Sequence, residues 1–367
     1  MLIGAVCRIM NGMSSDDSDS DGAGADRGGD GRGNALRPPH EEPAPPPPGG
    51  LLWQAAGEVR TLLSLPSALV MQVAHPAVGA GVDEYSVFRT DPWGRAERSL
   101  ASVQLWVYGG AEGVEEGRRL RRLHRGIQGV DAHGREYHAL APANYAWVHA
   151  TGFPVYRYAR LRLGPRPYTP QEERRLYAEW LQVGRLLGLR DRDMPQSVEE
   201  FWPYYRRVLD RELEHTAVVG ELVDVRRPVP PPDRGPRALR VVLRTVWPVL
   251  WPAAARVQRF LTVGLMPPDA REAVGLPWTP RQERRLRMLG RVVRTLFPLL
   301  PERLRYLPPA YRARRAYRER LRTESGSTGP GRTGARRTGT LRGGARGSGT
   351  PRTRGRRPPG RAVGGGG

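Results

Sequence analysis

Lysine is absent from this chain of 367 residues, and all 59 of its cationic side chains are arginine. Isoleucine and asparagine occur three times each, against 45 glycines and 36 prolines. This skew is typical of a GC-rich coding sequence, so part of the formal net charge of +22 reflects codon composition. The charge alone therefore does not establish nucleic acid or an anionic membrane as a partner.

Cysteine is nearly absent as well, because Cys7 is the only one. A single cysteine excludes an intramolecular disulfide, a Cys-rich zinc or iron–sulfur site, and covalent haem attachment through a Cys-x-x-Cys-His motif. It also favours a reducing compartment. The first residues form too short an apolar run for a secretory signal and lack a basic start. We therefore expect no export and a cytoplasmic location.

Long hydrophobic runs are also lacking. The best candidate for a membrane span, residues 241–265, is interrupted by three arginines and two prolines. A membrane helix needs about 20 mostly apolar residues, and each central arginine costs about 2.5–3.5 kcal/mol on insertion scales. We expect no transmembrane helix, whereas attachment to a membrane surface through amphipathic C-terminal helices stays open.

Both ends of the chain have a composition that cannot form a core. Residues 1–50 are rich in Ser, Asp, Gly and Pro with a net charge of −4, and residues 322–367 are rich in Gly, Arg and Thr with a net charge of +10. We expect both to be disordered. The folded part then consists of a main body, 51–227, and a C-terminal helical portion of the same domain, 228–321, which meet at a proline-rich hinge.

The part between the tails has apolar residues at helical spacing, few alternating runs, and several helix caps, which predicts an all-α domain. One helix is expected to start at Asp91-Pro92 and end at Gly109-Gly110. A second is expected over residues 115–127. A third should start at Thr169-Pro170, with carboxylates in its first turn, and end near Leu187-Gly188.

The common catalytic motifs are missing: there is no His-Glu-x-x-His, Gly-x-Ser-x-Gly, Walker loop or Rossmann glycine pattern. Among seven histidines, His124 is the most informative, because Leu120 and Ile127 lie four before it and three after it on the same helix face. A neutral imidazole with one free nitrogen is a ligand for haem iron or another metal. The alternative is a core histidine whose ring binds a backbone carbonyl.

The helix before His124 carries a cluster of cationic and hydroxyl groups. Arg95, Arg98, Ser99 and Ser102 are neighbours at spacings of three and four. An arginine and a hydroxyl that face the His124 helix could hold haem propionates and orient dioxygen. The alternative is that these arginines form a solvated helix face, as expected in so arginine-rich a chain.

An ordered set of motifs resembles one protein family. The motifs are QVAHPAVGAGV at 72–82, FRTDPWGRAERS at 88–99, RLHRGIQG at 122–129, WVHAT at 147–151 and FLTVGLMPP at 260–268. In this order, over roughly residues 51–290, they resemble the DUF2236 family of MpaB-type oxygenases and rubber oxygenases (latex-clearing proteins). The resemblance implies an all-helical bundle, with the globin-like core of the rubber oxygenases, that holds a b-type haem.

The resemblance also implies roles for single residues. His124 matches the proximal haem ligand, and Arg95 the arginine of the haem pocket. Ser99 stands where rubber oxygenases have a threonine, and Arg98 where they have a lysine that can cap the iron. Glu84, or its neighbour Asp83, lies near the position of the carboxylate proposed as the base. Because this chain has no lysine, a lysine-capped iron is excluded.

Two further histidines lie beside apolar segments. Pro76 removes a helical hydrogen bond and is expected to kink the chain next to His75. His75 and His149 are candidates for lining the pocket, and the alternative for each is a core histidine with satisfied hydrogen bonds.

The sequence thus favours a haem b-dependent oxygenase acting with dioxygen on a small lipophilic, alkene-like substrate. The first alternative is a non-catalytic helical protein of the same fold that binds a ligand or partner. The second is a nucleic-acid binder acting through the tail of residues 322–367, which we rank last because the chain has no recognition motif for specific nucleic acid.

Overall fold

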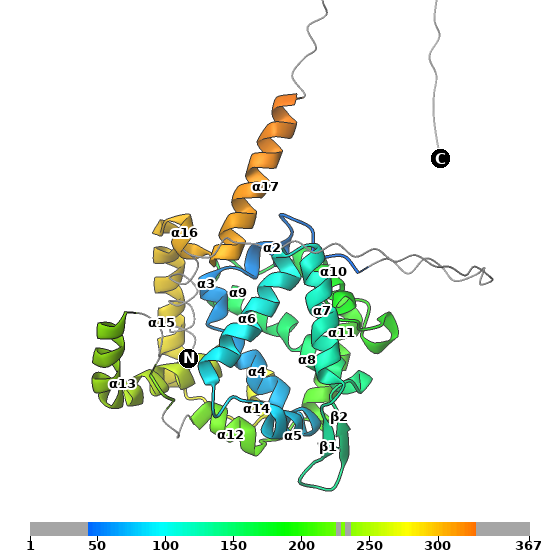
Figure 1. Cartoon of the computed structure of the whole chain (residues 1–367), viewed down its shortest axis with the longest axis vertical. Helices are drawn as coiled ribbons and strands as arrows, with labels where there is room; N and C mark the ends of the chain where they lie inside the picture. The colour runs from blue at the N-terminus through cyan, green and yellow to red at the C-terminus, as the bar shows by residue number, and fades with distance from the viewer. Residues whose placement is uncertain (1–42, 225–228, 232–235, 328–367) are drawn as a thin grey trace, which may run out of the picture. The chain divides into compact units, whose positions relative to one another are not determined.

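The computed structural model describes residues 43–224, 229–231 and 236–327 (Figure 1). Most of the predicted N-terminal arm, and the predicted tail from residue 328 onward, lie outside these ranges. Residues 225–228 and 232–235, within and beside the predicted hinge, also lie outside them. Residues 322–327 were expected to belong to the disordered tail, but they continue the last helix to Ser327.

The prediction of an all-α fold is confirmed. The helices in the part of the chain that the structure describes are α2 (Leu51–Ala55), α3 (Val59–Leu62), α4 (Leu65–Val73), α5 (Pro76–Tyr85), α6 (Pro92–Tyr108), α7 (Ala111–His124), α8 (Pro142–Ala150), α9 (Gly152–Leu163), α10 (Pro170–Leu186), α11 (Val198–Arg211), α12 (Ala217–Asp224), α13 (Arg237–Gly264), α14 (Pro268–Ala273), α15 (Pro280–Leu296), α16 (Glu302–Arg305) and α17 (Pro308–Ser327). Two short 3-10 helices cover Asp191–Asp193 and Phe297–Leu299. Strands β1 (Gln128–Val130) and β2 (Glu136–His138) pair antiparallel, with Gly129 opposite Tyr137.

The helical core is centred on aromatic side chains of α8 to α11. Trp147, Phe153, Tyr177, Phe201 and Tyr205 are fully buried. The Phe153 ring lies 4.9 Å from the Tyr177 ring and 5.0 Å from the Phe201 ring, both edge to face. These contacts join α9, α10 and α11 in one aromatic core, against which the surrounding helices pack.

Helices α6 and α10 have the limits that their capping residues predict. Asp91, the N-cap residue of α6, accepts a hydrogen bond from the Gly94 amide, and Gly109 is the C-cap residue of the same helix. Thr169 and Glu172 form a capping box at the start of α10. Gly188 follows the end of α10 with φ +81°, a value that favours glycine.

The predicted second helix is wrong at both ends, because α7 runs from Ala111 to His124 and not from 115 to 127. Ile127 instead precedes β1, and its carbonyl accepts a hydrogen bond from the Ala139 amide at 2.9 Å. Pairing of β1 with β2 therefore takes this segment out of the helix. His124 becomes the last residue of α7.

The expected kink at Pro76 is a full break between α4 and α5. Considered together, Val59–Val73 and Pro76–Tyr85 are bent by 106°, and His75 is the N-cap residue of α5. In the described ranges, no single helix has the length and apolarity needed to cross a membrane, although this bent pair together meets both criteria. The break turns α5 across the end of α4, so that both helices face one cavity.

Candidate functional site

A cavity of about 550 Å³ lies among α4 to α10, with Leu52 of α2 also on its wall. Its volume is in the range of roughly 300–1,000 Å³ that is usual for ligand sites. Most of its wall is apolar, contributed by aliphatic and aromatic side chains of α4, α5, α7, α8 and α10. The arginines that line it, Arg95, Arg98 and Arg119, come from α6 and α7. Such a cavity suits a largely apolar ligand with a few charged groups on one side.

His124 lies on the cavity wall at the end of α7. Its Nδ1 is 2.7 Å from the carbonyl oxygen of Leu120, so Nδ1–H donates this bond and Nε2 keeps the lone pair. No group within the described ranges hydrogen-bonds to Nε2. The ring also meets the Tyr145 ring edge to face at 6.0 Å. His124 is thus a half-buried imidazole with a fixed tautomer and a nitrogen available for a ligand.

Arg95, on α6, is the charged group of the cavity that lacks a counter-ion in the described part of the chain. It lines the cavity and is half-buried, and no carboxylate of residues 43–224, 229–231 or 236–327 pairs with its guanidinium. Burial, with a smaller contribution from nearby Arg98, lowers the pKa of Arg95. A bound anion would relieve both effects, because it replaces the lost hydration and offsets the repulsion.

Arg98 and Ser99 also line the cavity, but both are exposed. Arg98 pairs with Asp91 at 3.1 Å, next to the start of α6. These two residues therefore lie at the open side of the cavity. The alternative of a solvated arginine face describes Arg98 well and does not describe Arg95.

His149 is buried on α8 and lines the same cavity. Its Nε2 donates to the carbonyl oxygen of Trp180 at 3.0 Å, and its ring stacks on the Trp180 ring at 4.9 Å. Burial lowers the pKa of His149 to about 4, so the ring is neutral at pH 7. His149 therefore matches both interpretations: its ring is hydrogen-bonded like that of a core histidine, and it also lines the cavity.

His75 is not among the residues that line this cavity. Its Nε2 lies 3.3 Å from a carboxylate oxygen of Glu212, and its Nδ1 is buried without a hydrogen-bond partner among the described residues. Burial lowers the pKa of His75 more than Glu212 raises it. The break at Pro76 thus directs His75 towards the segment after α11.

Glu84 and Asp83 do not line the cavity either. Glu84 is exposed and accepts a hydrogen bond of 2.5 Å from the hydroxyl of Tyr137, which is buried on β2 and does line the cavity. Asp83 is paired with Arg89, which also binds Glu221 at 2.7 Å. Glu84 therefore reaches the cavity only through Tyr137.

A cluster around Glu116 was not found from the sequence. Glu116 is buried on α7 and accepts a hydrogen bond of 2.6 Å from Ser102 Oγ, while Arg119 binds the same carboxylate. Ser102 and Arg119 both line the cavity. The pairing with Arg119 lowers the pKa of Glu116. The spacing of three between Glu116 and Arg119 was a signal, but it is also common on solvated helix faces.

The sequence comparisons identify the family of the chain. Residues 53–295 match the family described as ER-bound oxygenase mpaB/B'/Rubber oxygenase, catalytic domain. The chain belongs to this family. It is also similar to an uncharacterized protein of Mycobacterium bovis and to one of Mycobacterium tuberculosis, each 27% identical over 249 residues, which cover 65% of this chain and 90% of each relative. No solved structure shows a significant match. The oxygenase family indicates an enzyme.

The cavity residues fit the haem that the family resemblance implies. Haem needs an axial ligand, an apolar slot and cations for its propionates. His124 has a free Nε2, the wall is mostly apolar, and Arg95 lacks a carboxylate partner within the described ranges. No group of three or more His, Cys, Asp or Glu side chains there could hold a bare metal ion.

Proposed function

We propose that this protein is a haem b-dependent oxygenase that uses dioxygen on a small lipophilic, alkene-containing substrate. The observation that carries the proposal is the His124 imidazole on the wall of an apolar cavity, with Nδ1 bound by the Leu120 carbonyl and with no described residue hydrogen-bonded to Nε2. Membership of the oxygenase family supports the reaction class. A cytoplasmic location remains a prediction from the sequence.

In this proposal, the residues of the cavity have different roles. His124 would ligate the iron through Nε2, and the Leu120 carbonyl would hold the imidazole in the required tautomer. Arg95 would bind a propionate carboxylate. Haem, when bound, supplies the redox chemistry towards dioxygen. The apolar wall excludes water and accepts the substrate.

Arg98 stands where the family resemblance places a lysine that can cap the iron. A guanidinium stays protonated and has no lone pair for a metal. Arg98 is also turned to the surface, where it pairs with Asp91 at 3.1 Å. Arg98 would therefore not ligate the iron of a bound haem, in contrast to the lysine that the family resemblance places at this position.

The visible spectrum of protein purified from haem-supplemented cells tests the proposal. We expect a Soret band that His124→Gly abolishes and that added imidazole restores, because the small ligand enters the space left by the side chain. His133→Ala, at an exposed histidine, and His149→Ala should keep the band. A colourless wild-type protein that refuses added hemin and carries no iron would refute the cofactor and favour the non-catalytic alternative.

A further inference from the structure

Helix α13 carries a stripe of aliphatic side chains that faces solvent. Val242, Val246, Val249 and Val257 recur at helical spacing and are between 37% and 80% exposed. On the other side of the helix, Trp251 is buried and Trp247 is half-buried. An exposed aliphatic stripe of this length on a helix with a buried second face is unusual for a surface that meets only water.

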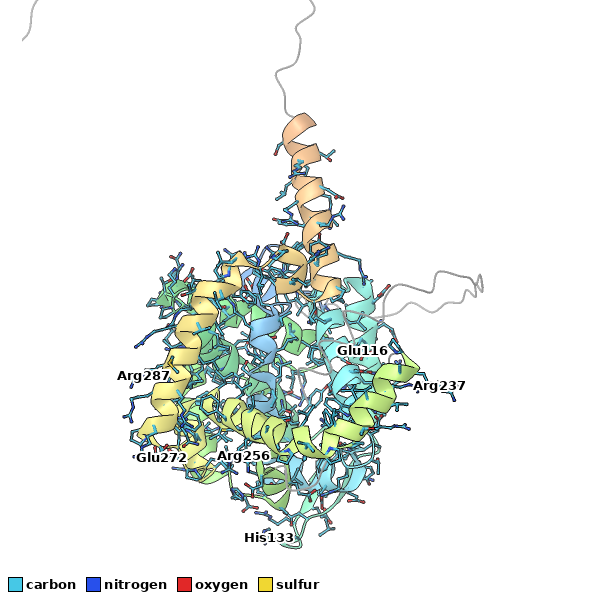
Figure 2. All side chains as sticks on the ribbon, turned by 90° about the vertical axis from the view of Figure 1, so that its left-hand side faces the viewer. Glu116, His133, Arg237, Arg256, Glu272 and Arg287 are labelled. Carbon is cyan, nitrogen blue, oxygen red and sulfur yellow. The ribbon has the colours of Figure 1, made fainter. Side chains whose placement is uncertain are left out.

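Helix α15 packs beside α13 and repeats the pattern. Met288, Val292 and Leu296 follow one another at spacings of four and are 48% to 60% exposed. We call these three residues and the four valines of α13 the α13–α15 face. Figure 2 shows α13 crossing the side of the molecule that faces the viewer, with α15 next to it.

The same two helices are strongly cationic. Between Arg237 and Gly264, α13 contains five arginines and no Asp or Glu. Among the described residues, Arg237, Arg244 and Arg256 have no carboxylate partner, nor do Arg287 and Arg291 of α15. Figure 2 labels Arg237 and Arg256 on α13 and Arg287 on α15.

Neighbouring carboxylates do little to neutralise this charge. Asp224 is paired with Arg259, and Glu283 is paired with Arg162 at 2.7 Å. Glu272 of α14 is an exposed carboxylate near the C-terminal half of α13 (Figure 2). Among the residues that the structure describes, the unpaired arginines of the two helices thus outnumber the unpaired carboxylates around them.

From this combination we infer that the α13–α15 face docks on the surface of an anionic phospholipid bilayer. A helix at a membrane interface buries aliphatic side chains at the level of the acyl chains while its arginines bind the phosphate groups. This inference concerns only the surface and does not depend on the cofactor.

Other binding partners would match either the arginines or the aliphatic side chains of this face, but not both. A nucleic acid would bind the arginines but would leave the valines against its charged backbone. A second copy of the chain would cover the valines but would bring unpaired arginines of the two copies together. The acidic segment within residues 1–42 matches the charge, but its Ser, Asp and Gly residues offer little apolar area.

A bilayer bound to the α13–α15 face would lie close to the cavity. The ring of Trp247 on α13 lies 6.5 Å from that of Trp93 at the start of α6, edge to face. Trp93 is two residues before Arg95, and Arg98 and Ser99 follow at the open side of the cavity. A bilayer on α13 would therefore bind a helix that packs against the start of α6, and α6 lines the cavity.

The single cysteine makes the test specific. In full-length protein with Cys7→Ser, a Val249→Cys substitution is labelled with the environment-sensitive dye NBD, and Val130→Cys on β1 is the matched control, since Val130 is 61% exposed. Vesicles contain either phosphatidylcholine alone or phosphatidylcholine with phosphatidylglycerol, at about 0.15 M salt, where distant surface charges are screened. We expect a blue shift and increased emission at position 249 only, and only with the anionic vesicles.

Three results would overturn the inference. Equal shifts at positions 249 and 130 would indicate non-specific adsorption of a cationic protein. Vesicle flotation without a shift at 249 would assign binding to the arginine-rich tail. A probe at 249 that is already shielded without vesicles would mean that another segment of the chain covers the face.

A charge-neutral variant separates the aliphatic stripe from the arginines. Val242→Ser, Val249→Ser and Val257→Ser together should weaken flotation with the anionic vesicles about tenfold or more, because the apolar area is lost while every arginine stays. Val130→Ser should bind like the wild type. Unchanged thermal unfolding shows that both variants fold. Wild-type binding by the triple variant would refute docking through this face.

Discussion

At the scale of single residues, the site depends on what binds each side chain. His124 and His149 both line the cavity, yet their rings differ. His124 is half-buried at a helix end, and its Nε2 has no hydrogen-bond partner among the described residues, whereas His149 is 7% exposed and stacked on Trp180. The difference makes His124 the better ligand and His149 the better pH-sensitive reporter of burial.

His149 predicts a loss of stability in mild acid. Its pKa falls from about 6.5 in the unfolded chain to about 4 in the folded one, so the unfolded state binds more protons between these values. The stabilising effect is complete above pH 6.5 and is lost as the pH falls towards 4. From pH 7 to pH 5 the free energy of unfolding should drop by about 2 kcal/mol through this residue.

Urea unfolding at the two pH values measures this effect. The His149→Phe variant should lose about 2 kcal/mol less than the wild type between pH 7 and pH 5, whatever its absolute stability. His133→Gln, at an exposed histidine, should follow the wild type. Equal pH dependence in wild type and His149→Phe would show that burial does not shift this imidazole.

At the scale of elements, the position of α7 decides where His124 lies. Gly117 lies at the crossing of α7 and α10, where a Cβ atom would be 2.3 Å from the carbonyl oxygen of Leu186. Only glycine allows the two backbones to approach so closely. The crossing therefore sets the depth of α7, and with it the place of His124 on the cavity wall.

Gly117→Ala should destabilise the protein by about 1–3 kcal/mol, because the added methyl group meets backbone that cannot rotate away. Helix propensity alone would favour alanine by up to about 1 kcal/mol, so the sign of the change identifies the cause. Urea unfolding gives the free energy. The control is Gly126→Ala, where a Cβ would meet nothing within 4 Å and the change should stay within about 0.5 kcal/mol. A Gly117→Ala variant more stable than the wild type would contradict the close crossing.

The helix ends show which features of the fold could be predicted from the sequence. The caps at Asp91 and Thr169 are local hydrogen bonds, and they predicted the starts of α6 and α10. The end of α7 was missed because it depends on pairing between β1 and β2. Tyr137 on β2 was missed for the same reason, since no helical period places a hairpin tyrosine on a helical cavity wall.

At the scale of the whole molecule, contacts between distant segments close the fold. Glu179 of α10 is 3% exposed and accepts hydrogen bonds from the amides of Leu51 and Leu52, at 3.0 Å and 2.7 Å. The amide of Leu307 donates to the carbonyl of Gly57 at 2.9 Å. The first helices are thus held by both the middle and the C-terminal part of the described chain.

Glu179→Ala should lower the free energy of unfolding by about 2–3 kcal/mol, because two amides at the start of α2 lose a charged acceptor in a buried place. Glu199→Ala is the matched control. Its carboxylate pairs with Arg174 at 3.3 Å on the surface, and its loss should cost no more than about 0.5 kcal/mol. Chemical denaturation of the two variants in parallel checks the difference. Equal effects would mean that Glu179 does not secure α2.

The sequence by itself determined the helical class, the main caps, the family motifs and the absence of lysine, because these depend on neighbouring residues or on composition. The tertiary structure decided that Arg95 faces the cavity with no carboxylate partner among the described residues, that His75 is turned to Glu212, and that Glu84 is separated from the cavity by Tyr137. Helical spacing defines the direction of a side chain only relative to its own helix. What that side chain meets is set by segments far away in the chain, which pack together only in the folded protein.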